Sequence, residues 1–454
     1  MVLWHPSVSP LERKTNAAKK ITAAPPLILA GSFLMLIILG TGLLKLPFAT
    51  ATPFSWSQSL FTATSAVTVT GLSVVDTGTV FTTFGQAVIA LLIQCGGLGL
   101  MTFAIVTLIS LGGKIGFLER TVAKEAFNQT DTSTLASTAK NVLAYALFVE
   151  SIGMAILAVY WAPELGWKTS LFHGFFYTIS AFNNAGFALS ANNLIPYVED
   201  PVVNLTITGL FIVGGLGFSV WIDLHRNRCW SRLTPYSKMM ITGTILLNLF
   251  AVIAIYLIEY NNPHTLAHLS EHGKWLAAWF QAVTPRTAGF NTLPMDQLED
   301  STTALIMTLM FIGGGSLSTA SGIKVVTFMV MILATYGYLR RDDAIFVFKR
   351  EIPRETVSKA LALTMISVVV SWLAIFGLLL SEHAPMLDIM FEALSALGTV
   401  GLSRGLTPNL TPVGEFIIIV LMFIGRVGPL TLAYFLASPR ARKLRYPETK
   451  LAIG

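Results

Sequence analysis

Four glycines with similar neighbours are the residues whose types and spacing point most directly to chemistry. Gly71 lies in TVTGLS, Gly186 in NNAGFALS, Gly289 in RTAGFNT and Gly401 in TVGLS, each closing a short, partly apolar segment. Glycine adopts backbone angles that aim carbonyl groups inward. Carbonyl groups without helical partners are tolerated at membrane depth where they line a wet cavity, and their oxygens can replace an ion's water shell. We therefore predict that potassium, or another monovalent cation, binds at filter carbonyls of Thr70, Gly71, Ala185, Gly186, Ala288, Gly289, Val400 and Gly401.

A single glycine in an apolar helix is more often a close-packing residue than a functional one. Recurrence favours function here, because every filter glycine is followed by a second glycine cluster inside a long apolar run. The second clusters lie at Gly96, Gly214, Gly313 and Gly425, which are 25, 28, 24 and 24 residues further along. Such regular spacing indicates one unit repeated four times.

The elements that would position these glycines are eight apolar stretches, each of roughly the 20 residues that a membrane span needs. They form the pairs 25–46 with 81–111, 142–161 with 202–222, 239–257 with 303–338, and 357–380 with 413–436. Each pair encloses a segment of roughly 14 to 16 residues, too short to cross and too apolar for an ordinary loop, which is typical of a re-entrant half-helix. These segments are 57–70, 170–185, 275–288 and 386–400.

The predicted fold is an all-α integral membrane protein with eight transmembrane helices. Two spans in each repeat give successive repeats the same orientation, so four helix, pore-helix, helix repeats surround a pseudo-four-fold axis along the membrane normal and enclose a central pore. The predicted divisions are a tail at 1–24, repeat 1 at 25–112, a loop with repeat 2 at 113–224, a loop with repeat 3 at 225–339, a loop with repeat 4 at 340–438, and a tail at 439–454.

Composition excludes several classes of protein. Hydrophobic residues make up 54% of the chain, charged residues 12%, and the mean hydropathy is +0.68, which leaves too little polar surface for a water-soluble enzyme. The net charge of +6 comes from cations in the tails and between repeats, so the positive-inside rule predicts that both termini are cytoplasmic and the protein is multi-pass in the cell (inner) membrane. A nucleic-acid partner is not expected, and membrane lipid is. No catalytic constellation is apparent, and we expect no enzyme activity.

The second helix of repeat 3 is interrupted by a run of small residues. We predict a gating loop beneath the filter, formed by Gly313, Gly314, Gly315, Ser316, Ser318, Thr319, Ser321 and Gly322. The alternative is tight packing against a neighbouring helix, which small residues also serve.

Ionisable residues inside spans are functional candidates, because burying a charge is costly. Lys324 follows the loop and could form an electrostatic barrier, whereas Arg426 could hold the loop through its backbone carbonyls; helix-end snorkelling is the alternative for both. Arg286 and Glu392 lie before Gly289 and Gly401, and we predict that they form a buried ion pair behind the filter.

Further charges flank the membrane. Glu150 is expected on a part of its helix that extends into the cytosol, and Arg404 at the outer mouth. Eleven outer acids face three lysines, which indicates either an acidic vestibule that concentrates cations or an ordinary soluble rim. They are Asp76, Glu164, Glu199, Asp200, Glu259, Glu271, Asp296, Glu299, Asp300, Glu382 and Asp388.

Several of these motifs together resemble those of a known family. TVTGL, FNNAGF, AVTPRTAGFNT, SALGTVGL, GGGSLSTASGIK and IGRVGPLT are similar to sequences of the Trk/Ktr/HKT superfamily of potassium transporters, and the short loops are most like the KtrB subfamily, the membrane subunits of bacterial Ktr systems. The resemblance covers nearly the whole chain. It implies that the four glycines are selectivity-filter glycines. A glycine in the first repeat, where some plant relatives have serine, favours potassium over sodium.

The resemblance also implies partners. These are a second copy of the chain in a homodimer, each subunit with its own pore, and a cytosolic RCK-type, KtrA-like regulatory subunit that binds ATP or ADP. Transport would be promoted by sodium, and the chain itself would hold no cofactor. Two functions stay open: a channel-like potassium translocation subunit, and an alternating-access symporter that couples potassium to sodium or protons. Four parallel repeats favour the first.

Overall fold

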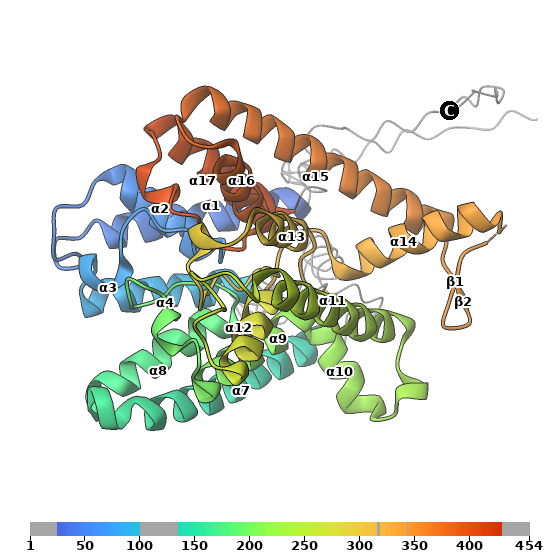
Figure 1. Ribbon diagram of the computed structural model, residues 1–454, viewed down its shortest axis with the longest axis horizontal. Coiled ribbons are helices and arrows are strands. Elements are labelled where there is room, and N and C mark those ends of the chain that lie inside the picture. Colours follow the sequence, from blue (N-terminus) through green and yellow to red (C-terminus); the bar gives the residue numbers. More distant parts are fainter. Residues whose placement is uncertain (1–24, 100–134, 316–317, 343, 429–454) are drawn as a thin grey trace, which may run out of the picture.

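The computed structural model describes residues 25–99, 135–315, 318–342 and 344–428, and these are mostly helical (Figure 1). The predicted tails 1–24 and 439–454, and the span ends 100–111 and 429–436, lie outside the described residues. So does residue 316 of the predicted loop. The strands that the structure describes form one antiparallel hairpin of β1 (Phe346–Val347) and β2 (Arg350–Glu351).

The helices fall into four successive groups, which we call quarters. The first quarter holds α1 (Pro25–Leu44), α2 (Trp56–Val67), α3 (Thr77–Val80) and α4 (Thr83–Gly97). The second holds α7 (Leu135–Leu165), α8 (Trp167–Phe182), η1 (Ile195–Tyr197), α9 (Pro201–Leu216), α10 (Phe218–Asn227) and η2 (Trp230–Arg232). The third holds α11 (Pro235–Glu259), α12 (Glu271–Val283), η3 (Met295–Gln297), α13 (Asp300–Phe311) and α14 (Val325–Arg340). The fourth holds α15 (Arg354–Ser381), α16 (Met386–Gly398), η4 (Thr407–Asn409) and α17 (Pro412–Val427).

Each segment predicted as a half-helix contains a short helix that ends before its filter glycine. These helices are α2, α8, α12 and α16, with 12, 16, 13 and 13 residues. Local sequence fixes where two of them begin: Ser55 caps α2 in a capping box with Gln58, and the Ser270 hydroxyl accepts the N–H of Gly273 in α12. The short helices are therefore confirmed.

Long apolar helices occur where spans were predicted. Within the part of the chain that the structure describes, three helices are long and apolar enough to cross a membrane, at 141–165, 235–259 and 354–381. The predicted span 202–222 is not straight: α9 and α10 meet at an angle of 89°. Gly217 makes this bend with a φ of +94°, which side-chain-bearing residues rarely adopt. The predicted break in the span 303–338 is confirmed, because α13 ends at Phe311 and α14 begins at Val325.

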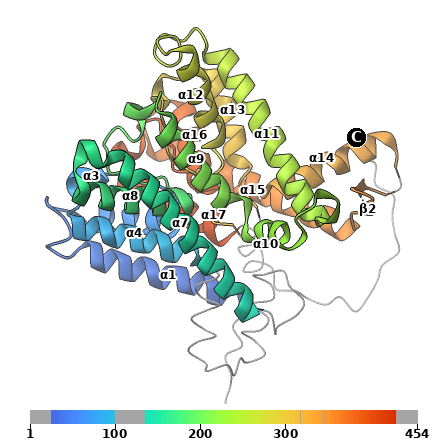
Figure 2. The same cartoon turned by 90° about the horizontal axis from the view of Figure 1, so that it is seen from below.

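The quarters pack around one another in chain order. Helix α4 contacts α8, α9 contacts α12, and α13 contacts α16 (Figure 2), while α17 returns to contact α2 (Figure 1). One apolar cluster joins the first and last quarters directly, with Phe61 and Leu72 packed among Ile389, Ile418 and Leu421. The short helices are largely buried within this arrangement.

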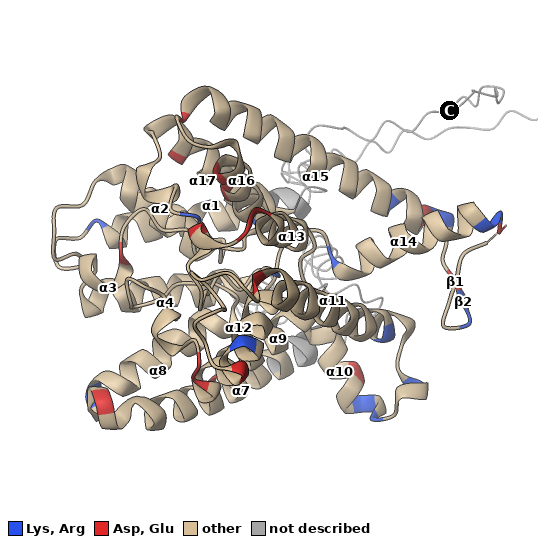
Figure 3. Ribbon diagram, in the orientation of Figure 1, with Lys and Arg blue, Asp and Glu red and all other residues tan. Residues whose placement is uncertain are grey.

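The outer faces of the long helices are apolar. Ile38 on α1, Phe148 on α7, Phe250 on α11 and Phe376 on α15 are 62%, 64%, 61% and 62% exposed. Lysines and arginines gather around α10, the hairpin and the adjoining ends of α14 and α15 (Figure 3). Large exposed apolar faces with cations at one end are typical of a protein embedded in lipid.

Candidate functional site

The four filter glycines lie next to one another, although they come from four quarters of the chain. A Cβ added to Gly71 would lie 3.1 Å from the Cα of Gly186, and one added to Gly186 would lie 2.7 Å from the Cα of Gly289. A Cβ added to Gly289 would lie 3.4 Å from the Cα of Gly401, and one added to Gly401 would lie 3.0 Å from the Cα of Gly71. The contacts close a ring in chain order, with no room for a side chain at any corner.

Carbonyl oxygens gather at the same ring. At each corner the missing Cβ position faces the carbonyl oxygen of the residue that precedes the next glycine, at 3.0 Å from Gly186 to Ala288 and 2.5 Å from Gly289 to Val400. Backbone coordination of an ion needs such a cluster of oxygens from separate strands. The four residues concerned are Thr70, Ala185, Ala288 and Val400, all buried.

Two left-handed residues shape each corner. The glycines have φ angles of +92°, +69°, +77° and +92°. The residue two positions earlier is also left-handed, with φ of +57° at Val69, +60° at Asn184, +72° at Thr287 and +49° at Thr399. Such angles are uncommon outside glycine and concentrate at functional sites. Sequence reasoning missed this second position, because valine, asparagine and threonine share no obvious signal.

A hydroxyl side chain near the end of each short helix holds the strand that follows. Ser65 accepts a hydrogen bond from the N–H of Gly71 at 3.0 Å, and Ser180 donates one to the carbonyl of Phe187 at 2.8 Å. The same two patterns recur in the fourth and third quarters, in the pairs Ser395–Gly401 and Thr284–Phe290. A serine or threonine shortly before each glycine is therefore a sequence signal that could have extended the predicted site.

The second glycine clusters serve close packing. A Cβ on Gly96, Gly214 or Gly425 would collide with the carbonyl oxygen of Val67, Phe182 or Leu397, near the end of a short helix. These glycines therefore let the second helix of a quarter approach the strand that carries its filter residues. The third quarter departs from the pattern, because Gly313 packs against the carbonyl of Ser321 within the interrupted segment.

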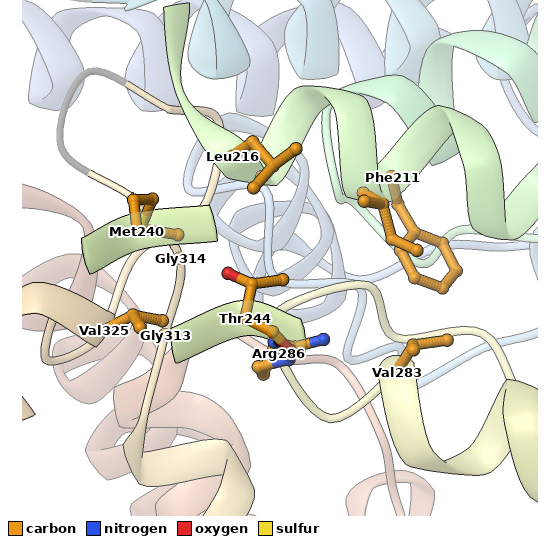
Figure 4. A pocket seen from close by; sticks show the side chains of 11 residues that line it. Phe211, Leu216, Met240, Thr244, Val283, Arg286, Gly313, Gly314 and Val325 are labelled. Atoms are coloured by element: carbon orange, nitrogen blue, oxygen red, sulfur yellow. Dashed lines mark hydrogen bonds between the residues drawn. The ribbon is translucent and has the colours of Figure 1, made fainter. Parts of the chain in front are cut away.

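The interrupted segment turns back on itself. Its two ends meet in an isolated parallel bridge between Ile312 and Ile323, where the N–H of Gly313 donates to the Ile323 carbonyl at 2.8 Å. The segment also pairs with the second quarter, because the N–H of Gly315 donates to the carbonyl of Gly215 at 2.8 Å. Figure 4 shows Gly313 and Gly314 lining a small cavity with Leu216.

The tip of the segment reaches the base of the filter. The Thr319 hydroxyl lies 3.3 Å from the carbonyl oxygen of Phe182 and 3.0 Å from the side-chain amide of Asn184. Asn184 is the left-handed residue two positions before Gly186. A displacement of the segment would therefore remove a contact to the filter strand of the second quarter.

Arg426 on α17 clamps the segment to the first quarter. One guanidinium nitrogen donates to the carbonyl of Thr319 at 2.5 Å and lies 3.3 Å from the Ser321 hydroxyl. The other donates to the carbonyls of Gly96 and Gly97, the latter at 3.1 Å. Arg426 holds the segment through backbone oxygens, as predicted. Lys324 donates to the carbonyl of Ala320 at 2.8 Å, and so belongs to the same segment.

The predicted ion pair between Arg286 and Glu392 is wrong. Arg286 lines the small cavity of Figure 4, where its guanidinium lies 3.5 Å from the carbonyl of Thr244 on α11. Glu392 instead accepts hydrogen bonds from the hydroxyls of Ser403 and Thr407, the second at 2.8 Å. Proximity of both residues to filter glycines along the chain was a poor guide, because Arg286 follows the end of α12 at Val283 whereas Glu392 lies within α16.

Glu150 is buried among neighbouring helices and does not lie on the exposed extension of its helix that the sequence had led us to expect. It is 7% exposed, because α7 begins at Leu135 and places Glu150 in mid-helix. The Gln94 amide donates to both carboxylate oxygens, at 2.9 and 3.0 Å. Asn183, next to the filter strand, donates to the Gln94 oxygen at 2.6 Å. The three side chains link α4, α7 and the end of α8.

Several outer acids stabilise local structure. Asp76 and Asp200 cap helices, while Glu259 and Glu382 are buried and accept hydrogen bonds from Thr265 and Thr411. The pKa of the Glu199 carboxyl is lowered first by a hydrogen bond from the Ser270 side chain and then by one from the Ser270 backbone N–H, at 2.7 Å. These contacts favour the ordinary-rim interpretation for these residues over an open acidic vestibule.

Arg404 joins the third and fourth quarters. It forms an ion pair with Asp388 at 2.7 Å, and its side chain is 11% exposed. It also donates to the carbonyl of Met295 and the hydroxyl of Thr303, both at 3.0 Å. The sequence led us to expect Arg404 at the outer mouth, but it did not reveal these partners in the third quarter.

Comparison with known proteins gives consistent matches along the whole chain. Residues 7–444 match the TrkH family, described as "Cation transport protein". The chain is 48% identical to the Ktr system potassium uptake protein B of Bacillus subtilis (strain 168), covering 97% of this chain and 99% of that protein. It is 43% identical to the Ktr system potassium uptake protein B of Vibrio alginolyticus, covering 96% of each chain.

Further matches are more distant. The potassium/sodium uptake protein NtpJ of Enterococcus hirae is 35% identical, covering 97% of this chain and 99% of that protein. The crystal structure of the potassium transporter TrkH from Vibrio parahaemolyticus superposes with a TM-score of 0.74 at 20% identity, over 94% of this chain and 87% of that one. At this identity the structural match establishes a shared fold.

Proposed function

Because the chain belongs to the TrkH family of cation transport proteins, we propose that it takes up potassium across the cell membrane as a channel-like translocating subunit. The observation that carries this proposal is the closed ring of four glycines with four peptide oxygens directed to it. The proposal includes eight spans in four like-oriented repeats, with the ring on their common axis. It assigns the chain to transport and not to enzymatic catalysis.

The chemistry is replacement of hydration. A potassium ion that reaches the ring exchanges water for the carbonyl oxygens of Thr70, Ala185, Ala288 and Val400. The C-terminal ends of the short helices point their partial negative charge to the same region, which favours a cation. One glycine per strand gives few coordination levels, so selectivity between potassium and sodium would be looser than in a filter with longer strands.

The gate in this proposal is the segment from Gly313 to Gly322, within which residues 316 and 317 lie outside the described residues. Its hydrogen bonds to Gly215, and of Arg426 to Thr319, support a closed position below the ring. Lys324 and Arg426 add positive charge there, which opposes the passage of a cation. Opening would release the segment from these partners.

Control of the gate would come from outside this chain. We propose a cytosolic regulatory subunit of the RCK type that binds ATP or ADP, a homodimer of the membrane subunit, and activation by sodium. The names of two relatives support parts of this proposal. A "Ktr system" has more than one component, which agrees with a partner subunit, and the NtpJ protein is named for potassium and sodium, which agrees with a role for sodium.

The experiment that tests translocation is electrical. Purified protein in a planar bilayer, with a potassium gradient but no sodium or proton gradient, should pass a current that reverses at the potassium equilibrium potential. An alternating-access symporter that couples potassium to sodium or protons should carry little current under these conditions. Potassium flux that requires a second ion gradient would therefore overturn the channel-like mechanism in favour of the symporter.

A further inference from the structure

A cavity of about 770 Å³ lies between the first turns of α7 and the bent helix α10, away from the glycine ring. Its volume is within the range of pockets that hold small organic ligands. Most of its wall is apolar, and Tyr145 and Trp221 face each other across 5.8 Å between ring centroids. Trp221 is fixed there by a hydrogen bond from its indole N–H to the carbonyl of Val213 at 2.9 Å.

The polar rim of this cavity is cationic. His225, Arg226 and Arg228 line it, and its lining includes no acidic residue. Among the described residues these three side chains make no hydrogen bond or ion pair. Arg228 occupies a left-handed position that ends α10, with φ of +48°, so backbone geometry fixes its place at the rim. Two arginines that have no acidic partner among the described residues, at the rim of an apolar pocket, are suited to an amphipathic anion.

The bend at Gly217 places α10 across the bundle. Helix α9 follows the direction of a span, and α10 turns from it by 89°. Figures 1 and 3 show α10 at the end of the molecule where lysines and arginines gather. A helix that lies across the end of a membrane bundle, with aromatic residues inward and cations at its end, has the character of an interfacial helix.

An apolar track leads away from the cavity along α7. Starting beyond Tyr145, the side chains of Phe148, Ile152, Ile156 and Val159 lie on one helical face and are 64%, 47%, 43% and 61% exposed. Residues spaced by three or four positions form a continuous stripe on a helix. The stripe offers hydrocarbon contact for a chain whose polar end occupies the cationic rim.

We propose that this cavity binds an acidic phospholipid, with the phosphate at Arg226 and Arg228 and an acyl chain along the α7 stripe. A free phosphate would match the rim but leave the aromatic wall and the stripe unused. A zwitterionic phospholipid would match the apolar surface, but its own cation would oppose the rim. The inference rests on membrane location and on this geometry, and does not depend on how the ring conducts potassium.

The test measures binding of fluorescent phosphatidylglycerol and fluorescent phosphatidylcholine to the purified full-length protein in detergent micelles. Phosphatidylglycerol should bind more tightly. Arg226→Gln with Arg228→Gln should weaken its binding by about 30-fold, since each cation near an anionic lipid contributes roughly a fivefold factor. Binding of phosphatidylcholine should stay unchanged in this variant.

A matched control variant is Arg340→Gln with Arg341→Gln. These arginines also occupy the last turn and the left-handed end of a helix, α14, with φ of +58° at Arg341. The control should keep the preference for phosphatidylglycerol. Equal binding of both lipids by the unmodified protein, or equal loss in both double variants, would overturn the proposal.

Competition distinguishes a lipid from a soluble anion. Unlabelled phosphatidylglycerol should displace the probe, whereas inorganic phosphate and soluble glycerophosphoglycerol at the same concentration should not. Complete displacement by phosphate would overturn the lipid assignment in favour of a simple anion site. As a second variant, Tyr145→Ser removes part of the apolar wall while keeping all the rim cations, and it should also weaken binding of phosphatidylglycerol.

Discussion

At the scale of single residues, the ring depends on four glycine positions at which two separate constraints exclude a side chain. The glycines adopt left-handed φ angles, and their missing Cβ atoms would meet the backbone of the next quarter. Either condition alone disfavours alanine; a left-handed backbone costs roughly 1–2 kcal/mol in a residue with a Cβ. Together they make each of the four glycines sensitive to the smallest substitution.

Gly289→Ala should reduce potassium uptake at least about tenfold, which corresponds to about 1.4 kcal/mol. Its Cβ would lie 2.5 Å from the Val400 oxygen and 2.9 Å from the Cα of Gly186, so two other strands must move. The measurement is rubidium or potassium uptake into proteoliposomes. Gly209→Ala is the control, because nothing lies within 4 Å of its added Cβ. Equal uptake by both variants would argue against the ring as the ion path.

Arg426→Gln should raise the flux that occurs without any regulatory partner. The change removes the charge and most of the contacts that tie Thr319 and Ser321 to the first quarter. Bilayer recordings with and without the partner give the ratio of basal to activated current. Arg426→Lys keeps the charge but cannot bridge both groups of carbonyls, and so separates the electrostatic barrier from the clamp. An unchanged ratio in Arg426→Gln would leave Arg426 with a structural role alone.

Glu150→Gln tests the buried network near the filter. A neutral amide at this position keeps the size of the side chain but cannot accept from the Gln94 amide at two equivalent oxygens. Leaving a buried polar group without one of its hydrogen bonds costs roughly 1–3 kcal/mol, so the thermal midpoint should fall. Ser151→Ala provides the neighbouring control, since Ser151 bonds only within its own helix and is exposed. An identical midpoint for both variants would count against a structural role for Glu150.

At the scale of elements, the sequence predicts more about helices than about their partners. Regular spacing and apolar length predicted the four short helices and the break between α13 and α14. The bend between α9 and α10 could not be predicted in this way, because GGLG fits both a packed helix and a left-handed turn at Gly217. The Arg286–Glu392 error has a similar cause: Glu392 lies within α16, whereas Arg286 follows the end of α12 at Val283, and spacing along the chain does not encode that difference in backbone conformation.

Removal of residues 314–321 should produce potassium flux that no longer responds to a regulatory partner. The chain can close over this deletion with little movement, since a Cβ on Gly322 would lie 3.3 Å from the Cα of Gly313. The bridge between Ile312 and Ile323 also lies outside the deleted residues. Currents with and without the cytosolic partner and nucleotide provide the measurement. Fully regulated uptake by the shortened protein would refute the assignment of this segment as the gate.

At the scale of the whole molecule, each pair of neighbouring quarters is joined by different contacts. The third and fourth quarters are joined by Arg404, which donates to the Met295 carbonyl and the Thr303 hydroxyl while Asp388 of its own quarter pairs with it; the two side chains of that pair are 11% and 23% exposed. The fourth and first share an apolar cluster and the Arg426 clamp. The division into four quarters could be predicted from the sequence because each quarter contains a similar glycine motif. The contacts between neighbouring quarters could not be predicted, because they are made by residues that are not repeated.

Asp388→Asn should lower the thermal stability by about 2 kcal/mol, because it leaves the largely buried Arg404 without its counter-ion. Arg404→Gln combined with Asp388→Asn should recover part of this loss, and a double-mutant cycle measures the coupling. Glu271→Gln is the control: its partner Lys274 lies in the same helix at 2.8 Å, and the glutamate side chain is 63% exposed. Additive effects of the two single changes would show that Asp388 does not stabilise Arg404, the residue that contacts the third quarter.

The direct contact between Gly401 and Thr70 has a consequence for biosynthesis. A ribosome delivers the chain from its N-terminus, so three corners of the ring exist before their last neighbour has been made. During that interval Thr70 and Gly289 each lack the adjoining strand, and their surroundings must be occupied by water, lipid or the insertion machinery. The nascent protein can therefore close its glycine ring only in one late step, when the final hairpin enters between the first and the third quarters.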